Sequence, residues 1–243
     1  MTSPPFSWPG GKSKLKKRII AEIPPHKTYV EPFVGGGSVF FAKPLAEKNV
    51  INDLDENLIN FYKDLKNNGC KTAKSCKLPT TKKQFDELNE KNPCGLMGQI
   101  KTSYGGKRKT FAPGTHERPH TTKNPKRQCN DQQTKLKKTS IHNEDFENVL
   151  EKYNEKDTFA YLDPPYVGSE NFFKSGGDDA SPEKVCKCLK KFKGKFLLSY
   201  NDNPRVKKAC KDFEIKKIDT KYEMQRKQTG TMKPVKELLI RNY

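Results

Sequence analysis

Long apolar runs are absent from this 243-residue sequence, in which hydrophobic residues make up only 32%. No stretch approaches the roughly 20 consecutive apolar residues that a membrane-spanning helix needs, and no signal peptide opens the chain. These absences argue against a membrane protein and against a secreted one. We expect a soluble, intracellular protein with no membrane partner.

Acidic residues are scarce relative to basic ones: 29 Asp and Glu face 48 Lys and Arg, which leaves a net charge of +19. Solubility does not require such an excess, so the composition indicates a polyanionic partner, with nucleic acid as the leading candidate. The length suits one large α/β domain, or one domain with a sizeable insertion, and is too short for two full catalytic domains.

C-x-x-C pairs are also missing, although the sequence contains seven cysteines. An odd number without such pairs predicts reduced thiols rather than a closed disulfide framework. A zinc site can be drawn from Cys94, His116, His120 and Cys129, but their spacing matches no standard zinc finger. We therefore expect ordinary loop residues at these positions, and no metal.

A phosphate-binding loop is present only in part. Residues 7–14, SWPGGKSK, look like the end of such a loop, but the place of its first glycine is held by Phe6. The loop should also follow a strand, and only five residues precede Phe6. Without the backbone N–H groups that curl around a phosphate chain, a nucleotide hydrolase is excluded.

Strand and helix patterns alternate through most of the chain. An amphipathic segment at 12–23 ends at two prolines, a strand then leads into Gly35 to Gly37, and a second strand ends at Asp53. The helix after Asp53 has an apolar side formed by Leu58, Ile59, Tyr62 and Leu65. Later elements are expected as helices at 146–153, from Ser181 onward and at 205–211, and as strands at 158–162, 195–200, 213–219 and 234–242. This alternation predicts an α/β fold with an open, mostly parallel sheet covered by helices on both faces.

The middle of the chain interrupts this alternation with lysine, threonine, glycine and proline, apart from a helix expected at 82–89. Such a segment cannot build a large core by itself. We therefore expect residues 1–67 and 139–243 to form one domain, with residues 68–138 inserted into it.

The three glycines after the first strand allow backbone to approach a ligand closely, because no side chains stand in the way. Asp53, at the end of the second strand, is positioned to accept hydrogen bonds from ribose hydroxyls. Together these features predict an adenosine-type cofactor, without separating NAD from S-adenosylmethionine.

The segment YLDPPY, residues 161–166, follows an apolar strand and so lies at the carboxyl edge of the sheet, where open α/β sheets bind substrates. Asp163 and the Pro164 carbonyl are expected to accept the two N–H groups of an exocyclic amine, while Tyr166 stacks on the ring that bears the amine. Accepting both hydrogens draws the nitrogen lone pair out of ring conjugation. The nitrogen is then able to attack an electrophilic methyl group.

Four motifs together carry a resemblance to a known family. EPFVGGGSVFF at 31–41, INDLDENLINFY at 51–62, DPPY at 163–166 and the opening WPGGKSK resemble the DNA adenine N6-methyltransferases of the Dam type. The resemblance spans nearly the whole chain, in the order called alpha: cofactor motif, recognition insert, catalytic motif. It implies S-adenosylmethionine as cofactor, double-stranded DNA as partner, and a Rossmann-like methyltransferase sheet of seven strands. The one antiparallel strand is expected to be KELLIRN at 236–242.

The resemblance also implies site residues. Its catalytic motif is matched by Asp163, Pro164, Pro165 and Tyr166. Its cofactor-binding residues are matched by Trp8, Lys12, Glu31, Phe33, Gly35, Gly37, Asp53, Asp145, Phe146 and Asp163. In the implied reaction, N6 of an adenine flipped out of the duplex attacks the sulfonium methyl group in line, without a metal.

Residues 100–114, IKTSYGGKRKTFAPG, are expected to form two short strands around a glycine turn, and resemble the family's recognition hairpin. Tyr104 is expected to wedge into the space left by the flipped base. Lys107, Arg108 and Lys109 are expected to bind DNA, either by reading bases or by unspecific contact with phosphates. Arg118 and Arg127 lie in the same insert. Residues 115–138 depart from the better-known family members, so no recognition sequence is transferred.

Three alternatives stay open. An N4-cytosine methyltransferase uses related chemistry, but that class more often has serine where Asp163 stands. A methyltransferase acting on RNA or protein fits the core, although the recognition-like insert favours DNA. A non-catalytic DNA-binding protein explains the charge but leaves DPPY unexplained. The sequence also leaves open the oligomeric state and whether a cognate restriction endonuclease exists.

Overall fold

A computed structural model describes the backbone of residues 1–112, 125–168, 180–226 and 232–243. The helices are α1 Lys16–Ala21, α2 Ser38–Ala42, α3 Glu56–Asn68, α4 Cys70–Ser75, α5 Lys82–Asp86, α6 Pro93–Lys101, the 3-10 helix η1 Tyr104–Gly106, α7 Pro125–Lys137, α8 Phe146–Lys152, α9 Pro182–Leu189 and α10 Pro204–Ala209. The strands are β1 Thr28–Glu31, β2 Lys48–Asn52, β3 Ser140–His142, β4 Thr158–Leu162, β5 Lys195–Asn201, β6 Glu214–Arg226 and β7 Met232–Arg241.

The seven strands form one sheet in the order β3-β2-β1-β4-β5-β7-β6. Strands β1 to β5 pair in parallel, whereas β7 runs antiparallel to both of its neighbours, β5 and β6. The expected fold class and the antiparallel strand are therefore confirmed. Every residue of β1 and of β4 is buried, as expected for central parallel strands covered on both faces.

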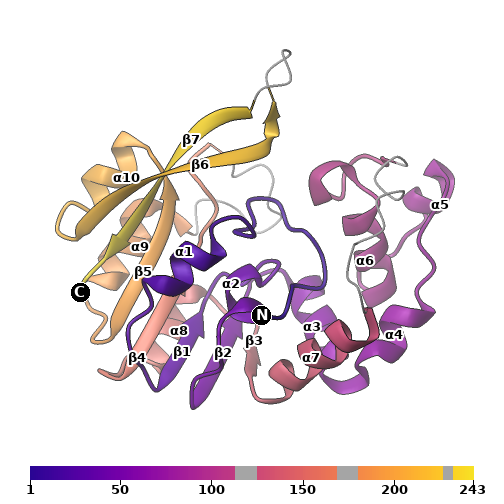
Figure 1. Cartoon of the computed structure of the whole chain (residues 1–243), viewed down its shortest axis with the longest axis horizontal. Coiled ribbons are helices and arrows are strands. Elements are labelled where there is room, and N and C mark those ends of the chain that lie inside the picture. Colours follow the sequence, from indigo (N-terminus) through magenta and orange to yellow (C-terminus); the bar gives the residue numbers. More distant parts are fainter. Residues whose placement is uncertain (113–124, 169–179, 227–231) are drawn as a thin grey trace.

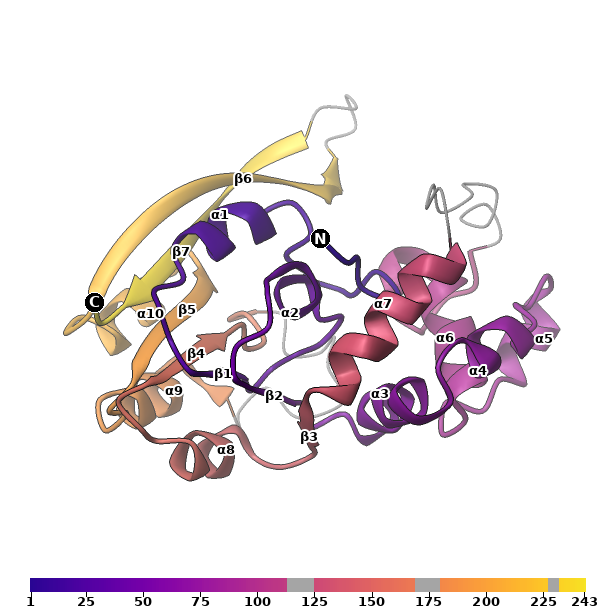
Figure 2. The same ribbon diagram turned by 60° about the horizontal axis from the view of Figure 1, so that its bottom comes forward.

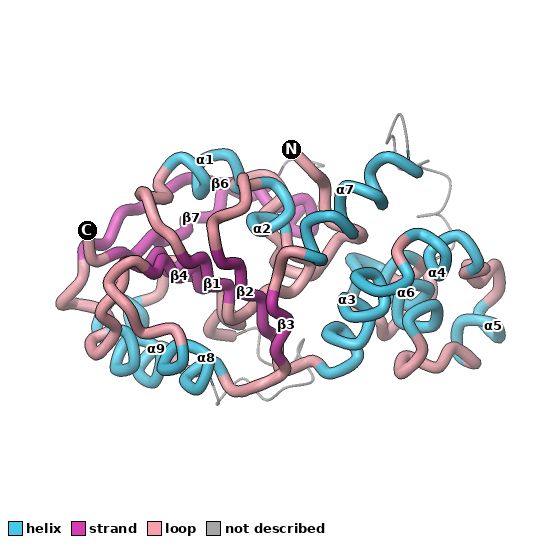
Figure 3. The backbone as a smooth tube through the Cα atoms, turned by 90° about the horizontal axis from the view of Figure 1, so that it is seen from below, coloured by secondary structure: helices cyan, strands magenta, loops and turns pink. Residues whose placement is uncertain are grey.

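Helices cover both faces of the sheet, with α1 and α2 on one side and α8 and α9 on the other (Figures 2 and 3). Successive strand residues alternate between the two resulting cores. Tyr29 and Phe159 belong to the core that includes residues of α1, α2 and α3. Val30 and Ala160 belong to the core that includes residues of α8, α9 and α10. This period of two places the ends of the strands, and the loops that follow them, between two packed layers.

The helices α4 to α7 form a separate group beside the sheet, here called the helical insertion (Figure 1). This group packs against α3, which contacts α4, α6 and α7. Its apolar side chains Leu96, Met97, Ile100 and Leu136 join the core of which α3 is a part. The insertion is thus held to the sheet through α3, and shares a core with it.

The α-helices α4, α6 and α7, the 3-10 helix η1 and the strand β3 were absent from the expectation. Helix α6 begins at an Asn92 cap, whose side chain accepts from the Cys94 N–H, with Pro93 in the first turn. Helix α7 contains mostly polar residues, which hide its apolar side in the sequence. Strand β3 has only three residues and none is fully buried, so no alternation pattern marks it.

The predicted hairpin at 100–114 is wrong in its secondary structure. Ile100 and Lys101 are the end of helix α6, and η1 follows at Tyr104–Gly106. The described part of this segment contains one isolated antiparallel bridge, between Ser103 and Phe111, rather than two strands. Helix α6, which begins at the Asn92 cap, continues through two residues that the glycine turn suggested were strand. Residues 113 and 114 lie outside the described residues.

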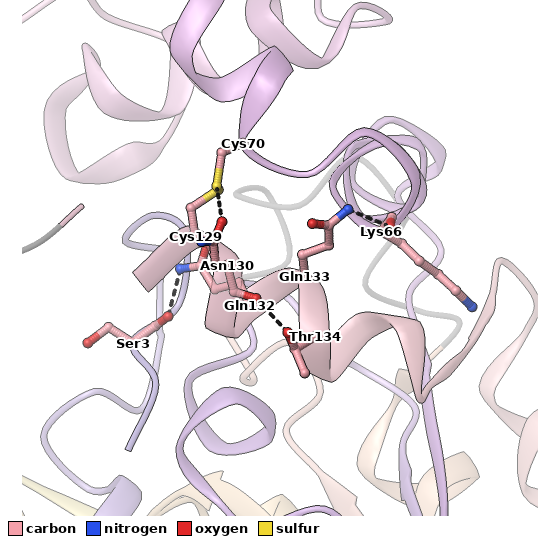
Figure 4. Close-up of a disulfide and its surroundings, with 8 residues drawn as sticks. All are labelled: Ser3, Lys66, Cys70, Cys129, Asn130, Gln132, Gln133 and Thr134. Carbon is pink, nitrogen blue, oxygen red and sulfur yellow. Dashed lines mark hydrogen bonds between the residues drawn. A yellow bond between two sulfur atoms is a disulfide. The ribbon is translucent and has the colours of Figure 1, made fainter. Parts of the chain in front are cut away.

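The prediction of reduced thiols is also wrong. Six cysteines form disulfides, as Cys70–Cys129, Cys76–Cys94 and Cys186–Cys210, and within the described residues Cys188 is the free one. The first links α4 to α7, as Figure 4 shows. Pairing depends on which chain segments the fold brings together, and the sequence spacing carried no sign of that.

The zinc site that was drawn and set aside has no support in the described residues. Two of its residues, Cys94 and Cys129, are disulfide-bonded to other cysteines, while His116 and His120 lie outside the described residues. No group of three metal-ligating side chains occurs in the part of the chain that is described. Among the same residues, no helix has the length and apolar character needed to cross a membrane.

Candidate active site

The glycine-rich loop after β1 lies under the amino-terminal segment. Gly35 and Gly37 adopt positive φ angles of 46° and 70°, which L side chains rarely adopt. A Cβ atom at Gly35 would lie 2.8 Å from Cδ1 of Trp8, and one at Gly36 would lie 2.7 Å from Cβ of Trp8. The glycines are therefore needed for Trp8 to cover this loop.

Asp53 holds the loop from the end of β2. Its carboxylate accepts the N–H of Gly35 at 2.9 Å and the N–H of Asp55 at 3.0 Å. Tyr62 donates from its hydroxyl to the Gly35 carbonyl at 2.7 Å. Burial raises the pKa of Asp53 to about 6, against the effect of these two N–H donors. Asp53 thus fixes the loop and keeps lone pairs for a further donor.

Asn52, which the sequence did not single out, joins this loop to the segment before α8. Its Nδ2 donates to the carbonyls of Pro32 and Glu144, each at 2.9 Å, and its Oδ1 accepts the Glu144 N–H at 2.9 Å. Asn143 adds a bond from its side chain to the Asp53 carbonyl at 2.8 Å. A polar residue at the end of a buried strand was the signal available in the sequence.

These bonds bring Asp145 and Phe146 beside the loop. Phe146 is 1% exposed, and its ring centre lies 5.2 Å from that of Phe33, which is partly exposed. Asp145 caps α8 by accepting the Glu147 N–H at 2.8 Å, and lies 3.5 Å from Lys184. The Phe33 ring is the partly exposed one of this pair, and the buried Phe146 ring packs against it.

The DPPY turn after β4, which the sequence predicts to be the catalytic turn, is held by two donors. Lys12 lies 2.7 Å from Oδ1 and 2.8 Å from Oδ2 of Asp163, and Ser199 on β5 donates to Oδ1 at 2.8 Å. The side chain of Lys12 is 2% exposed and also donates to the Gly10 carbonyl at 2.8 Å. The lysine of the incomplete phosphate loop therefore meets a carboxylate. Ser199 was not anticipated, although it is a hydroxyl within a strand of buried residues.

The Tyr166 ring packs against Tyr200 and Lys12. It stacks on Tyr200, with 5.8 Å between the ring centres, and Lys12 Nζ lies 4.7 Å from the Tyr166 ring centre. Asn201 donates to the Val167 carbonyl at 3.2 Å, which fixes the chain just beyond. The backbone of Pro164 and Pro165 adds stiffness to this turn. The side chains of Asp163 and Tyr166 are thus each held in place by Lys12 and by a residue of β5.

Glu31 lies beneath the site, at the end of β1, and is buried. It accepts a hydrogen bond from the Tyr29 hydroxyl at 2.6 Å. Its pKa is raised to about 8, chiefly by burial and also by the charge of Asp163, while the Tyr29 hydroxyl and Lys43 act in the opposite direction. Lys43 lies over the Tyr29 ring, 4.1 Å from its centre.

The residues expected to contact DNA occupy two different environments. Tyr104 is 60% exposed, and Lys109 is also exposed. Arg108, by contrast, pairs with Asp55 at 2.8 Å, both side chains being 10% exposed, and its guanidinium lies 5.4 Å from the Trp8 ring centre. In this structure the Arg108 side chain contacts other parts of the protein, and joins the helical insertion to Asp55 and Trp8. As a DNA contact it stays a prediction, as do Tyr104, Lys107 and Lys109.

The chain matches one family model, described as D12 class N6 adenine-specific DNA methyltransferase, over residues 8–95 and 96–224. It is 28% identical to the type II methyltransferase M.MjaIII of Methanocaldococcus jannaschii, over 99% of each protein. It is 25% identical to the type II methyltransferase M1.LlaDCHI of Lactococcus lactis subsp. cremoris, over 98% of this chain and 95% of that protein.

A shorter match joins the chain to the DNA N-6-adenine-methyltransferase of Escherichia phage P1, with 47% identity over 60 residues, 25% of this chain and 8% of that protein. Among solved structures, a precorrin-6y C5,15-methyltransferase from Geobacter metallireducens GS-15 is similar with a TM-score of 0.46 and 8% identity, over 95% of this chain and 87% of that one.

Proposed function

The chain belongs to the D12 class of N6 adenine-specific DNA methyltransferases, and from that premise we propose how its residues bind S-adenosylmethionine and methylate adenine in duplex DNA. The single observation that carries the proposal is the environment of Asp163. A carboxylate with one fixed orientation, next to a rigid carbonyl-bearing turn and an aromatic ring, suits an exocyclic amine on a planar base.

The loop residues fit S-adenosylmethionine. Asp53 keeps lone pairs for the ribose hydroxyls, the glycines of residues 35–37 let Trp8 lie close against the loop, and Phe33 offers a ring beside the end of β1. The Asp163 carboxylate, which is partly exposed and paired with Lys12, suits the positive charge that the cofactor carries. When bound, the cofactor supplies an electrophilic methyl group on a sulfonium.

Asp163 and Pro164 act as hydrogen-bond acceptors for the amino group of the target adenine. The Asp163 carboxylate and the Pro164 carbonyl accept the two N–H groups of N6, so that its lone pair is directed at the methyl group. Lys12 and Ser199 hold the carboxylate in one orientation before the substrate arrives, which lowers the reorganisation needed in the transition state. Tyr166 contacts the base through its ring, with Tyr200 supporting it from behind.

The target adenine is paired inside the duplex and is flipped out for the reaction, at a cost of a few kcal/mol. Stacking on Tyr166 returns about 1–3 kcal/mol, and contacts with the DNA backbone supply the rest. The net charge of +19 and the exposed ring of Tyr104 support this part of the proposal. We assign the DNA contacts to the helical insertion, within residues 68–138, and the chemistry to residues 1–67 and 139–243.

Substituting Lys107 tests the DNA surface. Lys107→Ala is expected to weaken DNA binding and to reduce the slope of log affinity against log salt by about one. Lys156→Ala is the matched control, because Lys156 is exposed in the loop before β4, at the edge of the sheet opposite the catalytic turn. An unchanged affinity and slope for Lys107→Ala would remove this segment from the interface.

The two relatives that match over nearly their whole length are named type II methyltransferases. We propose accordingly that this protein recognises a specific site, and that it acts beside a restriction endonuclease in a restriction-modification system. Protection of DNA by the purified protein against endonucleases of different specificity measures both the specificity and the recognised site.

One experiment tests the function as a whole. The protein is incubated with S-adenosylmethionine labelled in its methyl group and with DNA or RNA of equal length, and the nucleic acid is digested to nucleosides. Label in N6-methyldeoxyadenosine is expected. Label in N4-methyldeoxycytidine or in RNA nucleosides would replace the proposal with one of the alternatives, and no label in any product would leave a DNA-binding protein without catalysis.

A further inference from the structure

A buried carboxyl group that no motif singled out lies beside the catalytic turn. Glu237 on β7 has a relative exposure of 0%, and within the described residues neither of its oxygens meets a donor at hydrogen-bond geometry. Burying an ionised carboxylate without hydrogen bonds is costly, so a group of this kind requires an explanation.

The pairing of β5 with β7 places Glu237 at the same edge of the sheet as the catalytic aspartate. Glu237 pairs with Asn201 across the two antiparallel strands, and paired residues have Cβ atoms about 4.5–5.5 Å apart. Ser199 lies two residues before Asn201 and so on the same face of β5. Ser199 is the residue that donates to Asp163. Glu237 therefore shares a face with the donor that holds Asp163.

Four charged or titratable side chains act on Glu237 or are affected by it. Lys12 lowers its pKa, Asp163 raises it, and the Tyr166 hydroxyl, which faces it, lowers it. Tyr161 on β4 is near enough for the charge of Glu237 to raise the pKa of its hydroxyl. On the other neighbouring strand, β6, the paired residue Ile218 brings no charge.

Burial is the largest effect and raises the pKa of Glu237 to about 7. A group in this range changes its protonation when the charge nearby changes by one unit. The reaction proposed above changes the local charge twice: a cation enters with the cofactor, and the positive charge leaves sulfur when the methyl group is transferred.

We propose that Glu237 is the proton acceptor of the methyl-transfer site, losing a proton when the cationic cofactor binds and taking up the proton that N6 gives off on methylation. This inference rests on the proposed function. It assigns Glu237 a role in proton transfer through Asp163 rather than contact with the base.

The proposed methyl transfer conserves atoms and electrons. N6 forms a bond to the methyl carbon as the carbon–sulfur bond breaks, and the electron pair of that bond stays on sulfur. N6 is left with one proton too many, and this proton goes to the Asp163 carboxylate, which already accepts an N–H of the amine. From Asp163 it passes to the Glu237 carboxylate, which the Tyr166 hydroxyl faces and whose proton affinity has risen because the neighbouring positive charge is gone.

Binding calorimetry tests the first half without any turnover. Heats of binding of S-adenosylmethionine and of S-adenosylhomocysteine are measured at pH 7 in buffers of different ionisation enthalpy, which gives the protons exchanged. The native protein is expected to release more protons with the cationic ligand than with the neutral one. In Glu237→Gln this difference is expected to shrink, while Glu214→Gln, on the exposed outer strand, keeps it. Equal proton release with both ligands in the native protein would overturn the inference, whether or not the variant folds.

Single-turnover methyl transfer tests the second half. Glu237→Gln is expected to lower the rate about tenfold, at the weak end of general-base effects because the contact is indirect, and to flatten the dependence of rate on pH near 7. Affinity for DNA is expected to stay unchanged, and Glu237→Asp is expected to recover part of the rate. A variant with the native rate and pH profile overturns the inference and leaves the proposed function intact. A native protein that transfers no methyl group to N6 overturns both.

Discussion

The sheet and the helical insertion are held together in different ways. The sheet has two apolar cores, one on each face, and the central strands are buried over their whole length. In the insertion, the described apolar side chains that are buried are Phe85, Leu96, Met97, Ile100 and Leu136, and two of the disulfides lie there. A segment with so little interior of its own needs covalent links, as small domains do.

Polar contacts supplement the disulfides of the insertion. Lys135 of α7 donates to the carbonyls of Phe40 and Lys43 at the end of α2, and Gln133 donates to the Lys66 carbonyl of α3. These bonds attach α7 to helices of the sheet rather than to its own neighbours. The comparison indicates that the proposed catalytic residues lie on the part of the molecule that burial stabilises, whereas the proposed recognition surface lies on a part held by links between segments.

Removing the proposed catalytic carboxylate should have the largest effect, and the effect should be confined to the sheet. Asp163→Ala is expected to lower methyl transfer by about 10³-fold or more, because the acceptor that orients N6 is lost. Cofactor binding is expected to survive largely, and this is measured by calorimetry beside single-turnover rates. Asp157→Ala, an exposed position before β4 paired with Lys27, is the control. Retained turnover in Asp163→Ala would show that the catalytic assignment is wrong.

Removing one disulfide of the insertion should make the insertion unfold separately from the sheet. Cys70→Ser with Cys129→Ser opens a loop with a sequence separation of 59 residues, and a cross-link of that span stabilises by about 4 kcal/mol in the loop-entropy model. The insertion is expected to open at lower temperature than the sheet, with DNA binding lost and cofactor binding kept. Hydrogen exchange of α4 and α7 against β1 and β4 measures the separation.

Cys188→Ser is the control for that variant, since Cys188 lies on α9 and forms no disulfide. A single unfolding transition at the native temperature would mean that the insertion does not depend on the disulfide, and the contrast drawn between the two regions would fail.

Raising the pH should destabilise the sheet through its buried carboxyl groups, whereas in the insertion Lys135, whose pKa burial lowers to about 8, acts in the opposite direction. The pKa of Glu31 is raised from 4.5 to about 8, so the folded state holds this proton more tightly than the unfolded chain does. The associated stability is present below pH 4.5 and is lost as pH rises through 8, with a limiting slope of about 1.4 kcal/mol per pH unit. Asp53, with a pKa raised to about 6, acts in the same direction at lower pH.

Melting temperatures of the ligand-free protein between pH 5 and 9 measure this effect. The native protein is expected to lose stability across the range, and Glu31→Gln to lose less, because the amide still accepts from the Tyr29 hydroxyl but carries no charge. Glu47→Gln, in the loop before β2, serves as the exposed control. If Glu31→Gln and the native protein lose stability equally, the burial of Glu31 does not govern the pH dependence.

The same contrast explains how much the sequence could predict. The order of strands and helices around β1, β2, β4 and β5 followed from apolar runs and from caps such as Ser181, because those signals are local and burial reinforces them. The glycine loop, Asp53 and the DPPY turn followed because they stand directly after such strands. The insertion was predicted less well, since its disulfides, its helix α7 and the end of α6 depend on contacts with α3 that leave no periodic pattern.

Within the site, the residue types were predicted but not all of their partners. The sequence indicated Lys12 and Asp163 separately, and nothing in the spacing of 151 residues showed that they form an ion pair. Ser199, Asn52 and Glu237 were missed because a polar residue next to buried apolar residues of a strand carries no local sign of its partners. Their importance follows from strand register, which brings neighbours together across the sheet.

Arg108 connects the two regions, and substituting it tests whether they act independently. It pairs with Asp55, two residues after Asp53, and lies over Trp8, which covers the glycine loop. Arg108→Ala is therefore expected to weaken cofactor binding about tenfold in the absence of DNA, or about 1.4 kcal/mol. Arg205→Ala, which breaks an exposed pair with Glu183 between α10 and α9, should leave it unchanged. If Arg108→Ala weakens DNA binding alone, the arginine binds DNA, through bases or phosphates, as the sequence predicted, and the ion pair with Asp55 is broken when DNA binds.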